Sequence, residues 1–514
     1  MKRGPLKVFY SYAHEDESMR DRIEEHLELL KRQQLIIGWY DRHIIPGTAW
    51  NKVIGEQLLE ADIVLLLISR AFLDSDYVRR VEIPEAMKAF ESGQVRVIPI
   101  LLEETPGWEK EPFAQLQILP SEARPILEWE DPVHALRDVA RGIRRVARDV
   151  IIAGGGPFEF GPHEFSEAEL SMLDKVERAR TAAGLQRLRQ ALHEQIPPRR
   201  YEANLLLATW SLRKFGDRNR LPDPGAEALF YLAQIISSYD LVALQEVDQD
   251  LDRFHKLLEI LGPDWDSLLT DVAPGAWGNR ERFAIVYYKP RVEFRNFSSQ
   301  VILPPERTGP GEYTPATQLA RPPLIAAFRS GTLEFQVITT HIIFGGGNDA
   351  RSMQRRVEEI EKLGEYLQTR SRYAQNPLFL MGDFQVERPD SPLLQALRDS
   401  GVHIPDHLLL PSNLDQTKYY SQIGFVDPDR QPSYSFGEER AGAVDFFRYV
   451  YRSEDLDTYL TSAIFKEYNR QPYFKGKAGT KKEQERRYWF WKTYLMSDHL
   501  PLWVELELHA WSPL

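Results

Sequence analysis

The stretch Leu378-Phe379-Leu380-Met381-Gly382-Asp383-Phe384-Gln385 is an apolar run that ends abruptly in a glycine and a carboxylate. Such a run predicts a buried strand whose C-terminal end delivers Asp383 to a surface cleft. An aspartate after a strand more often begins a turn than takes part in chemistry. The run therefore becomes informative only beside similar runs elsewhere in the chain.

Four other apolar runs place a polar group directly after their hydrophobic residues. Residues 205–210 lead to Ser211, 241–244 to Gln245-Glu246, 335–340 to His341, and 494–496 to Ser497-Asp498-His499. Two further acids precede expected strands: Glu281 before 282–288, and Asp445 before 446–450. This repetition favours a shared chemical role over a set of unrelated turns.

At these residues, over about 203–510, the sequence resembles the endonuclease/exonuclease/phosphatase superfamily, which includes deoxyribonucleases, abasic-site endonucleases, sphingomyelinases and inositol phosphatases. The motifs occur in the order of that superfamily, from Thr209-Trp210 through Gln245-Glu246, Glu281, His341 and Gly382-Asp383-Phe384 to Ser497-Asp498-His499. Each motif is weak alone, and the ordered set carries the resemblance. It implies an α+β four-layer β-sandwich with flanking helices.

The resemblance also implies a metal-dependent phosphodiester hydrolase. A phosphodiester is cleaved when water attacks in line and the leaving oxygen is neutralised, and a hard divalent cation, Mg²⁺ or Mn²⁺, assists both steps. Such a cation needs only one or two carboxylates. By the resemblance, Glu246 and Asp498 are the metal ligands, and Asp383 orients or deprotonates the attacking water.

The two histidines need acidic partners, because a neutral imidazole must be held in one tautomer before it can move a proton usefully. In the superfamily the acid at Glu281 supports the histidine at His341, and the acid at Asp445 supports the histidine at His499. These pairs would bind the scissile phosphate and share general acid and base catalysis. The alternative is that each histidine is a hydrogen-bonded core residue.

The chain departs from the superfamily at two positions expected to contact phosphate or substrate. Ser211 and Gln385 stand where the superfamily has asparagine. Serine lacks the amide donor, and glutamine reaches about one carbon further. These changes bear on the level of activity and leave the metal site in place.

Length and composition indicate a multidomain protein of the reducing cytoplasm. A chain of 514 residues exceeds one ordinary core. It has no cysteine, which excludes disulfides, thiolate nucleophiles and thiolate-zinc sites. No signal peptide is expected. The most apolar stretch, 63–68, is far shorter than the ~20 residues that span a membrane, so no membrane partner is expected.

Because the net charge is -12, any binding of nucleic acid must depend on a local cluster of cations. One local candidate precedes Asp498, where cations alternate with aromatic residues that suit a phosphate backbone with stacked bases, DNA rather than RNA. The cations assigned to phosphate are Lys481, Lys482, Arg486 and Arg487. The alternative is a solvated loop beside a packed aromatic strand.

Residues 1–150 alternate strand and helix patterns, which predicts a flavodoxin-like α/β parallel sheet with helices on both faces. Phe9-Tyr10-Ser11-Tyr12, Ile45-Pro46-Gly47, residues 62–69 and Ser75-Asp76-Tyr77 followed by Glu82 carry a second resemblance. Over about 5–148 the sequence resembles a bacterial Toll/interleukin-1 receptor (TIR) domain. TIR domains also serve as self-association modules, so self-association is an expected partner mode.

Many TIR domains hydrolyse NAD, and the resemblance places the carboxylate that contacts ribose at Glu82, with Glu85 as a weaker candidate. A carboxylate stabilises the oxocarbenium-like cation formed as the nicotinamide bond breaks. Tyr12 and Trp50 would wall the NAD site, beside the loop containing Pro46 and Gly47. Alternatively, Glu82 is a first-turn helix acid and the aromatic residues are packing.

A glycine break at 154–156 predicts a hinge, which gives a domain at 1–150, a hinge and helical linker at 151–200, and a second domain at 201–514. In the linker, Ser166 and Glu169 form an expected capping box. The leading hypothesis is a cytoplasmic bacterial nuclease with a TIR assembly domain, suited to defence against invading DNA. The alternatives are a TIR NAD hydrolase with a degenerate phosphoesterase domain, and a pair of interaction modules.

Overall fold

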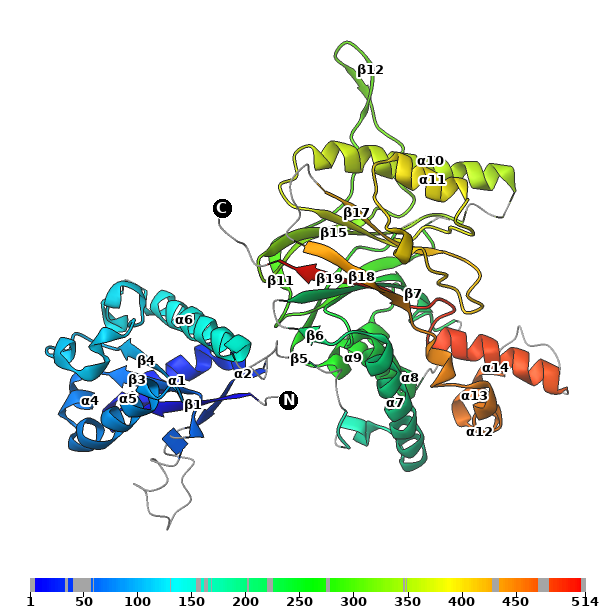
Figure 1. Cartoon of the computed structure of the whole chain (residues 1–514). Helices are drawn as coiled ribbons and strands as arrows, with labels where there is room; N and C mark the ends of the chain where they lie inside the picture. The colour runs from blue at the N-terminus through cyan, green and yellow to red at the C-terminus, as the bar shows by residue number, and fades with distance from the viewer. Residues whose placement is uncertain are drawn as a thin grey trace. The chain divides into compact units, whose positions relative to one another are not determined.

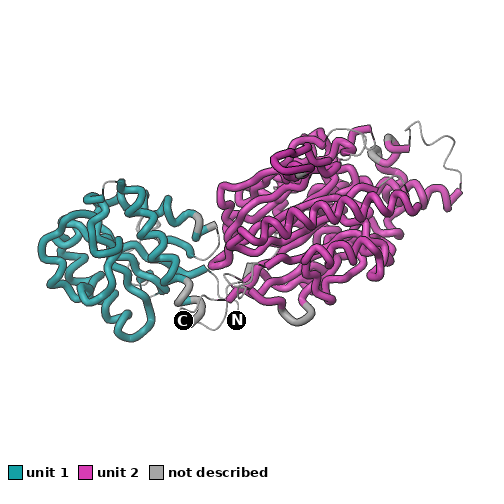
Figure 2. The backbone as a smooth tube through the Cα atoms, turned by 90° about the horizontal axis from the view of Figure 1, so that it is seen from above, with its two compact units in different colours: residues 1–158 teal, residues 159–514 magenta. Residues whose placement is uncertain are grey.

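The computed structural model of the chain describes residues 5–32, 36–39, 57, 58, 60–129, 131–153, 159, 160, 165–167, 169–200, 203–219, 225–273, 278–344, 347, 349–427, 434–469 and 480–509. Figure 2 shows the two compact units into which the chain divides, Met1–Phe158 and Glu159–Leu514. None of the helices in these described ranges combines the length and apolar character needed to cross a bilayer.

Unit 1 is built on a parallel four-stranded sheet in the order β2-β1-β3-β4. The strands are β1 (Leu6–Ser11), β2 (Ile36–Trp39), β3 (Ile63–Ile68) and β4 (Arg96–Leu101). Every residue of β3 is buried, which requires cover on both faces of the sheet. Helix α5 (Ile83–Glu91) packs on the face that carries Phe9, Val64 and Leu66. The expected flavodoxin-like α/β fold is confirmed.

The remaining helices of unit 1 are short apart from α6 (Pro132–Ala153), which contacts α1 and β4. Those whose bounds fall within the described residues are α1 (Glu17–His26), α2 (Glu28–Arg32) and α4 (Arg70–Asp74). The expected loop that contains Pro46 and Gly47, and Trp50 after it, lie outside the described residues.

Unit 2 contains two large sheets. The six-stranded sheet has the order β18-β19-β7-β8-β10-β9 and the five-stranded sheet the order β11-β14-β15-β16-β17. The bounds in the first are β7 (Asn204–Phe215), β8 (Leu241–Val247), β9 (Trp265–Leu269), β10 (Arg282–Tyr288), β18 (Tyr434–Ala443) and β19 (Leu502–Leu508). Those in the second are β11 (Glu293–Gln300), β14 (Leu324–Ser330), β15 (Leu333–His341), β16 (Leu378–Asp383) and β17 (Ser421–Val426).

Helices cover the outer faces of both sheets and complete four layers (Figure 1). Helices α10 (Ala350–Ser371) and α11 (Pro392–Asp399) cover the five-stranded sheet. Helices α7 (Lys175–Gln195), α8 (Glu227–Ile236) and α9 (Asp252–Leu261) cover the other. The expected four-layer sandwich is confirmed.

Successive side chains of β7 enter the two hydrophobic cores on opposite faces of the six-stranded sheet. Leu206, Ala208 and Trp210 join the core that contains α7 and α8, whereas Leu205 and Leu207 join the core of the facing sheet. Successive side chains of a strand point to opposite faces, so a continuous apolar run is buried on both sides.

Two segments differ from expectation. Residues 446–450, expected as a strand, form a 3-10 helix at Phe446–Arg448. The run at 481–495, alternatively read as a loop and strand, is helix α14 (Lys481–Leu495), because its buried Tyr488, Trp491 and Leu495 recur at helical spacing. The side chain of Thr480 caps this helix by accepting from the backbone N–H of Glu483 at 3.2 Å.

The smaller elements of unit 2 are the short pair β5 (Glu159–Phe160) and β6 (Arg199–Arg200), the hairpin of β12 (Glu306–Gly309) and β13 (Glu312–Thr314), and helices α12 (Leu456–Leu460) and α13 (Ala463–Tyr468). Figure 1 shows the hairpin projecting beyond the layers. The capping box is present: the backbone N–H of Ser166 donates to Glu169 at 2.7 Å, and that of Glu169 donates to Ser166 Oγ at 3.3 Å.

Candidate active site

The strand topology gathers the expected site residues at one edge of the sandwich. Strands β7 and β8 are parallel, while β10 and β19 run antiparallel to them, so the ends of the first pair lie beside the starts of the second. In the facing sheet, β15 and β16 are parallel, and their register pairs His341 with Asp383. Residues that follow or precede these strands therefore meet, although they are far apart in the sequence.

Local backbone features aim the side chains. A Cβ on Gly382 would lie 2.0 Å from the carbonyl oxygen of Thr340, so only glycine allows β16 to approach β15 just before Asp383. Glu246 and Gln385 adopt left-handed conformations with φ of 61° and 54°. Such strain costs about 1–3 kcal/mol per residue and persists where the surroundings fix it, commonly at functional sites.

His341 lies between two buried acids. Its Nδ1 is 3.2 Å from Glu281 Oε2, and its Nε2 is 3.8 Å from Asp383 Oδ2. Burial and Arg321 lower the pKa of His341, but Glu281 and Asp383 outweigh them and the pKa is raised. Burial raises the pKa of Glu281, but His341 and then Arg321 lower it to about 2. The structure thus brings together the predicted pair of Glu281 and His341 and favours its charged form.

Asp383 also faces His499, whose Nδ1 is 3.6 Å from Asp383 Oδ2. The other oxygen of Asp383 accepts from the backbone N–H of Gln385 at 2.9 Å and from its side-chain amide at 3.1 Å. The same amide nitrogen is 3.4 Å from His341 Nε2. Gln385 therefore fixes Asp383 between the two imidazoles.

The expected pairing of Asp445 with His499 is not the one that the structure records. The carboxylate of Asp445 accepts from Arg448 Nε at 2.7 Å, and the ion pair of His499 is with Asp383. The cause is the 3-10 helix at Phe446–Arg448, which brings Arg448 back toward Asp445. The ring of Tyr420 stacks on His499 with centroids 5.3 Å apart.

Glu246 enters the site from β8 and is held by Ser211. The hydroxyl of Ser211 donates to Glu246 Oε1 at 2.8 Å, and the backbone N–H of Lys214 donates to Oε2 at 3.2 Å. Burial, together with the charges of Glu281 and Asp498, raises the pKa of Glu246. Concentrated carboxylates of this kind favour a nearby cation.

Asp498 is paired with an arginine. Its Oδ2 is 3.3 Å from Arg213 Nε, and the guanidinium of Arg213 lies over Tyr494 at 4.3 Å and over Trp489 at 5.4 Å. Arg213 also donates to Thr493 Oγ1. The aromatic residues of α14 therefore hold the guanidinium of Arg213, which orients Asp498.

A divalent cation fits this donor set. Atoms of Glu246, His341 and Asp383 of the kinds that bind metals lie within 4.8 Å of one another, and His341 does not serve as a ligand in its protonated form. Among the described residues, Asp383 Oδ2 finds no hydrogen-bond donor although it is buried. A buried carboxylate oxygen that accepts no hydrogen bond is costly, and a water molecule held by a cation at Glu246 would donate one to it. Glu246 supplies an oxygen ligand of the kind that Mg²⁺ or Mn²⁺ prefers.

The four cations assigned to phosphate all lie on α14 but differ in exposure. Lys481, Lys482 and Arg486 are exposed, whereas Arg487 is buried and donates to Glu483 at 3.0 Å. Arg487 therefore packs the helix, and the other three face solvent.

In unit 1 the structure places Glu82 in a buried position at the end of a helical turn, where it accepts a hydrogen bond from Ser11. Burial, and then the charges of Glu82 and Glu85, raise the pKa of Tyr77. The guanidinium of Arg20 lies 5.3 Å from the centre of the Tyr12 ring. Pro46, Gly47 and Trp50 lie outside the described residues.

Three residues of the site were missed from the sequence. Arg321 lies 3.5 Å from Glu281 and donates to the carbonyl of His341 at 3.1 Å. Arg213 and Tyr420 contact Asp498 and His499, as described above. Arg213 lies two residues after Ser211, which was a usable signal, whereas the loops that carry Arg321 and Tyr420 show no pattern.

Comparison with known proteins identifies unit 1. Residues 8–134 match the TIR domain family, so this part of the chain is a TIR domain. The uncharacterized protein y4lF of Sinorhizobium fredii (strain NBRC 101917 / NGR234) is 39% identical over 150 residues. The matched part is 29% of this chain and 46% of that protein, so the chain spans less than half the length of the curated relative it matches.

The solved structures similar to the rest of the chain include endonuclease/exonuclease/phosphatase family proteins. One, from Bacteroides thetaiotaomicron, is 17% identical with a TM-score of 0.37, covering 60% of this chain and 98% of its own. The human Nocturnin catalytic domain with bound sulfate is 14% identical with a TM-score of 0.35, covering 59% and 94%. D. rerio TDP2 complexed with single strand DNA product is 14% identical with a TM-score of 0.36, covering 59% and 99%.

Proposed function

We propose that unit 2 is a Mg²⁺- or Mn²⁺-dependent phosphodiesterase that acts on nucleic acid. The observation that carries the proposal is the convergence of Glu246, Glu281, His341, Asp383 and His499 from two sheets onto one site. A metal-binding carboxylate beside two histidines and a buried aspartate is the set of groups that phosphodiester hydrolysis needs.

In this mechanism Glu246 holds the cation, and Asp498 serves as a second carboxylate. The cation, when bound, neutralises charge that develops on the phosphate and the leaving oxygen. Asp383 orients the attacking water and accepts its proton, since its Oδ2 has no hydrogen-bond donor among the described residues. His341, whose protonated form Glu281 favours, donates to a phosphate oxygen, and His499 approaches from the other side of Asp383.

Ser211 and Gln385 position groups that touch the substrate or the cation. Ser211 holds Glu246, and Gln385 holds Asp383 while its amide faces His341. Each therefore makes a hydrogen bond to a carboxylate of the site. We propose that the two departures tune the site without disabling it.

The exposed cations of α14 are expected to contribute to nucleic-acid binding. Replacing Lys481, Lys482 and Arg486 with glutamine should weaken binding equally across DNA sequences and reduce the slope of log K against log salt by up to about 3, because each lost phosphate contact removes about 0.9. Fluorescence anisotropy with a labelled duplex between about 50 and 200 mM salt measures this slope.

The matched control removes three exposed cations elsewhere in unit 2, at Lys256, Lys289 and Arg398. It changes the net charge by the same amount. An unchanged slope in the α14 variant, or an equal change in the control, would leave α14 without a specific role in binding.

For unit 1 we propose that the TIR domain self-associates and hydrolyses NAD through Glu82. Glu82→Ala should abolish nicotinamide release from NAD by the whole protein while phosphodiester hydrolysis continues unchanged. The carboxylate would stabilise the cation that forms as the glycosidic bond breaks, so its loss removes the charge the reaction depends on. Chromatography of released nicotinamide measures the effect.

Glu85→Ala is the matched control, one turn further along the same helical segment. If Glu85→Ala abolishes nicotinamide release and Glu82→Ala does not, the assignment moves to Glu85. If the unaltered protein releases no nicotinamide, the domain acts by association alone.

The wider setting is proposed by analogy. The expected domains are 1–150 and 201–514, and of the expected linker between them helix α7 packs on α8 within unit 2. The proposed location is the cytoplasm, and the proposed role is bacterial defence against invading DNA. The main alternative makes the TIR domain the effector and unit 2 a ligand-binding module. Incubating the whole protein with Mg²⁺ and separate samples of DNA, RNA, phosphoinositide and NAD decides between them by which one is consumed.

A further inference from the structure

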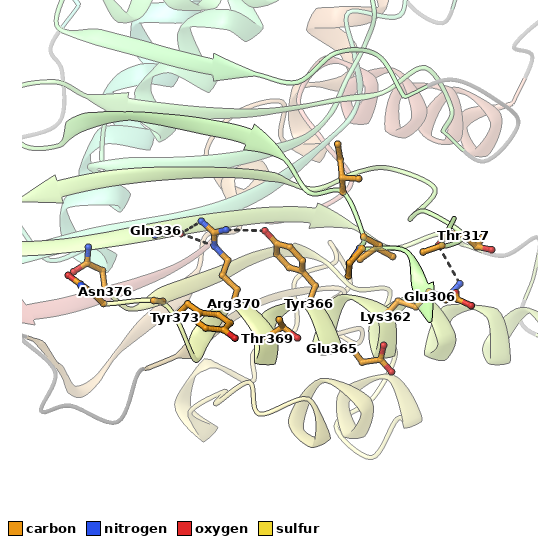
Figure 3. A pocket seen from close by; sticks show the side chains of 16 residues that line it. Glu306, Thr317, Gln336, Lys362, Glu365, Tyr366, Thr369, Arg370, Tyr373 and Asn376 are labelled. Atoms are coloured by element: carbon orange, nitrogen blue, oxygen red, sulfur yellow. Dashed lines mark hydrogen bonds between the residues drawn. The ribbon is translucent and has the colours of Figure 1, made fainter. Parts of the chain in front are cut away.

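A cavity of about 730 Å³ lies in unit 2, and its described lining contains none of the candidate active-site residues. Figure 3 shows the side chains that line it. It opens between the C-terminal half of α10 and the segments that flank the β12–β13 hairpin, with Gln336 of β15 in its lining. Gln336 precedes His341 by five residues on the same strand, a distance of roughly 16 Å at about 3.3 Å per residue. The volume is within the range of about 300–1,000 Å³ typical of small-molecule sites.

The walls of this cavity expose large apolar side chains. Tyr373 is 82% exposed and Ile302 is 74% exposed, the two highest values among the large hydrophobic residues in the described part of the chain. Both line the cavity, together with Tyr366, which lies seven residues before Tyr373. Exposed apolar groups gathered at one concave place mark a binding site more often than scattered ones do.

A fixed guanidinium lies between the two tyrosines. Arg370 donates to Gln336 Oε1 through Nε at 3.1 Å and through its terminal nitrogen at 2.8 Å, and to the hydroxyl of Tyr366 at 3.3 Å (Figure 3). Its carbon is 5.3 Å from the centre of the Phe297 ring. The guanidinium is therefore held as a flat surface, and three of its nitrogen atoms already donate hydrogen bonds.

The facing wall is held as firmly. The side chain of Gln318 accepts from the backbone N–H of Leu303 at 2.8 Å and donates to the carbonyl of Leu303 at 3.1 Å. This pair of hydrogen bonds joins the two segments that flank the hairpin and sets the position of Ile302 and Pro304 opposite α10. A site whose walls are fixed beforehand loses little entropy when it binds a ligand.

The described cavity lining carries equal numbers of cationic and anionic side chains. Its described lining carries two cations, Lys362 and Arg370, and two anions, Glu306 and Glu365. Such a lining does not concentrate positive charge and is poorly suited to a polyphosphate. It suits an uncharged flat ring whose edge carries both donors and acceptors.

We propose that this cavity binds a single unstacked nucleobase, as a second ligand site of unit 2. Bases stack on tyrosine rings and on guanidinium planes, and their edges pair with mixed donors and acceptors such as Lys362, Thr369 and Glu365. The base belongs either to a free nucleoside or to a single strand. The inference does not depend on hydrolysis at His341.

Titration of the whole protein with adenosine, and separately with a short single-stranded oligodeoxyadenylate, tests the proposal in EDTA, which suppresses metal-dependent cleavage. Calorimetry should give a Kd below about 1 mM for at least one probe. Tyr373→Ala should weaken that binding about tenfold or more, as loss of a stacking ring does. ATP should bind no more tightly than adenosine, because the lining is charge-balanced.

Tyr313→Ala is the matched control, since Tyr313 is 61% exposed on β13 and is not among the lining residues. Both tyrosines are exposed, so neither variant should change the unfolding temperature. Binding of adenosine identifies a nucleoside site, and binding of the oligonucleotide alone identifies a strand-binding site. Absence of binding by both probes, or equal affinity in the wild-type and Tyr373→Ala proteins, would overturn the proposal, whether or not the protein hydrolyses phosphodiesters.

Discussion

Replacing His341 with alanine is expected to lower the rate of phosphodiester hydrolysis by about a hundred- to ten-thousandfold, the range that a general acid or base contributes. Glu281 and Asp383 raise the pKa of His341, which favours the imidazolium form that can donate to a phosphate oxygen. Alanine removes both the proton and the positive charge. Steady-state cleavage of a labelled duplex in excess Mg²⁺ measures the loss.

His403→Ala is the matched control, because His403 is an exposed histidine of the same unit. It should leave the rate within about twofold of the wild type. Alanine at His341 also removes the imidazole that lies between the buried acids Glu281 and Asp383, so their repulsion is no longer offset. Circular dichroism must therefore confirm that the variant is folded. A folded His341→Ala protein that cleaves at the wild-type rate would remove His341 from the mechanism.

Glu246→Gln is expected to abolish metal-dependent turnover, and Ser211→Ala to weaken metal binding by roughly 10- to 100-fold, as loss of a residue that orients a ligand does. Glutamine keeps the size of the side chain and its contact with Ser211 but removes the negative charge. Ser211→Ala keeps the charge and removes the 2.8 Å hydrogen bond that orients it. The two variants therefore distinguish the effect of the Glu246 charge from the effect of its orientation.

Titration of activity against Mg²⁺ concentration distinguishes them. Ser211→Ala should recover most of its rate at high Mg²⁺, whereas Glu246→Gln should not recover at any concentration. Asp498→Asn gives a third point, since it leaves Arg213 without its carboxylate partner and should also impair turnover. Full activity in Glu246→Gln with ordinary Mg²⁺ dependence would show that the cation is held elsewhere.

Much of the fold could be predicted because long apolar runs have few alternatives. The stretch 378–385 contains β16, and 282–288 coincides with β10, since short runs of buried apolar residues satisfy a strand locally. Residues that end such strands could be expected to meet once the fold was recognised. Glu281, His341 and Asp383 do lie together.

What the sequence did not reveal depends on contacts between distant segments. Arg321 reaches Glu281 and His341 from a loop with no distinguishing pattern. The run 494–496 resembles the end of a strand but ends helix α14, because the preceding aromatic residues pack at helical spacing. Whether Asp445 faces His499 or Arg448 depends on a single turn of 3-10 helix, which short-range patterns do not specify.

Gln245 links the two halves of the site. Glu246 and Glu281 belong to the six-stranded sheet, and His341 and Asp383 to the five-stranded one, so the distances between them are preserved only while the sheets keep their relative position. The buried amide of Gln245 donates to Thr209 Oγ1 at 3.1 Å in its own sheet and to Thr339 Oγ1 at 2.9 Å in the other. It therefore resists shear between the sheets, and a sliding motion too small to unfold the sandwich would separate the metal ligand from the histidine.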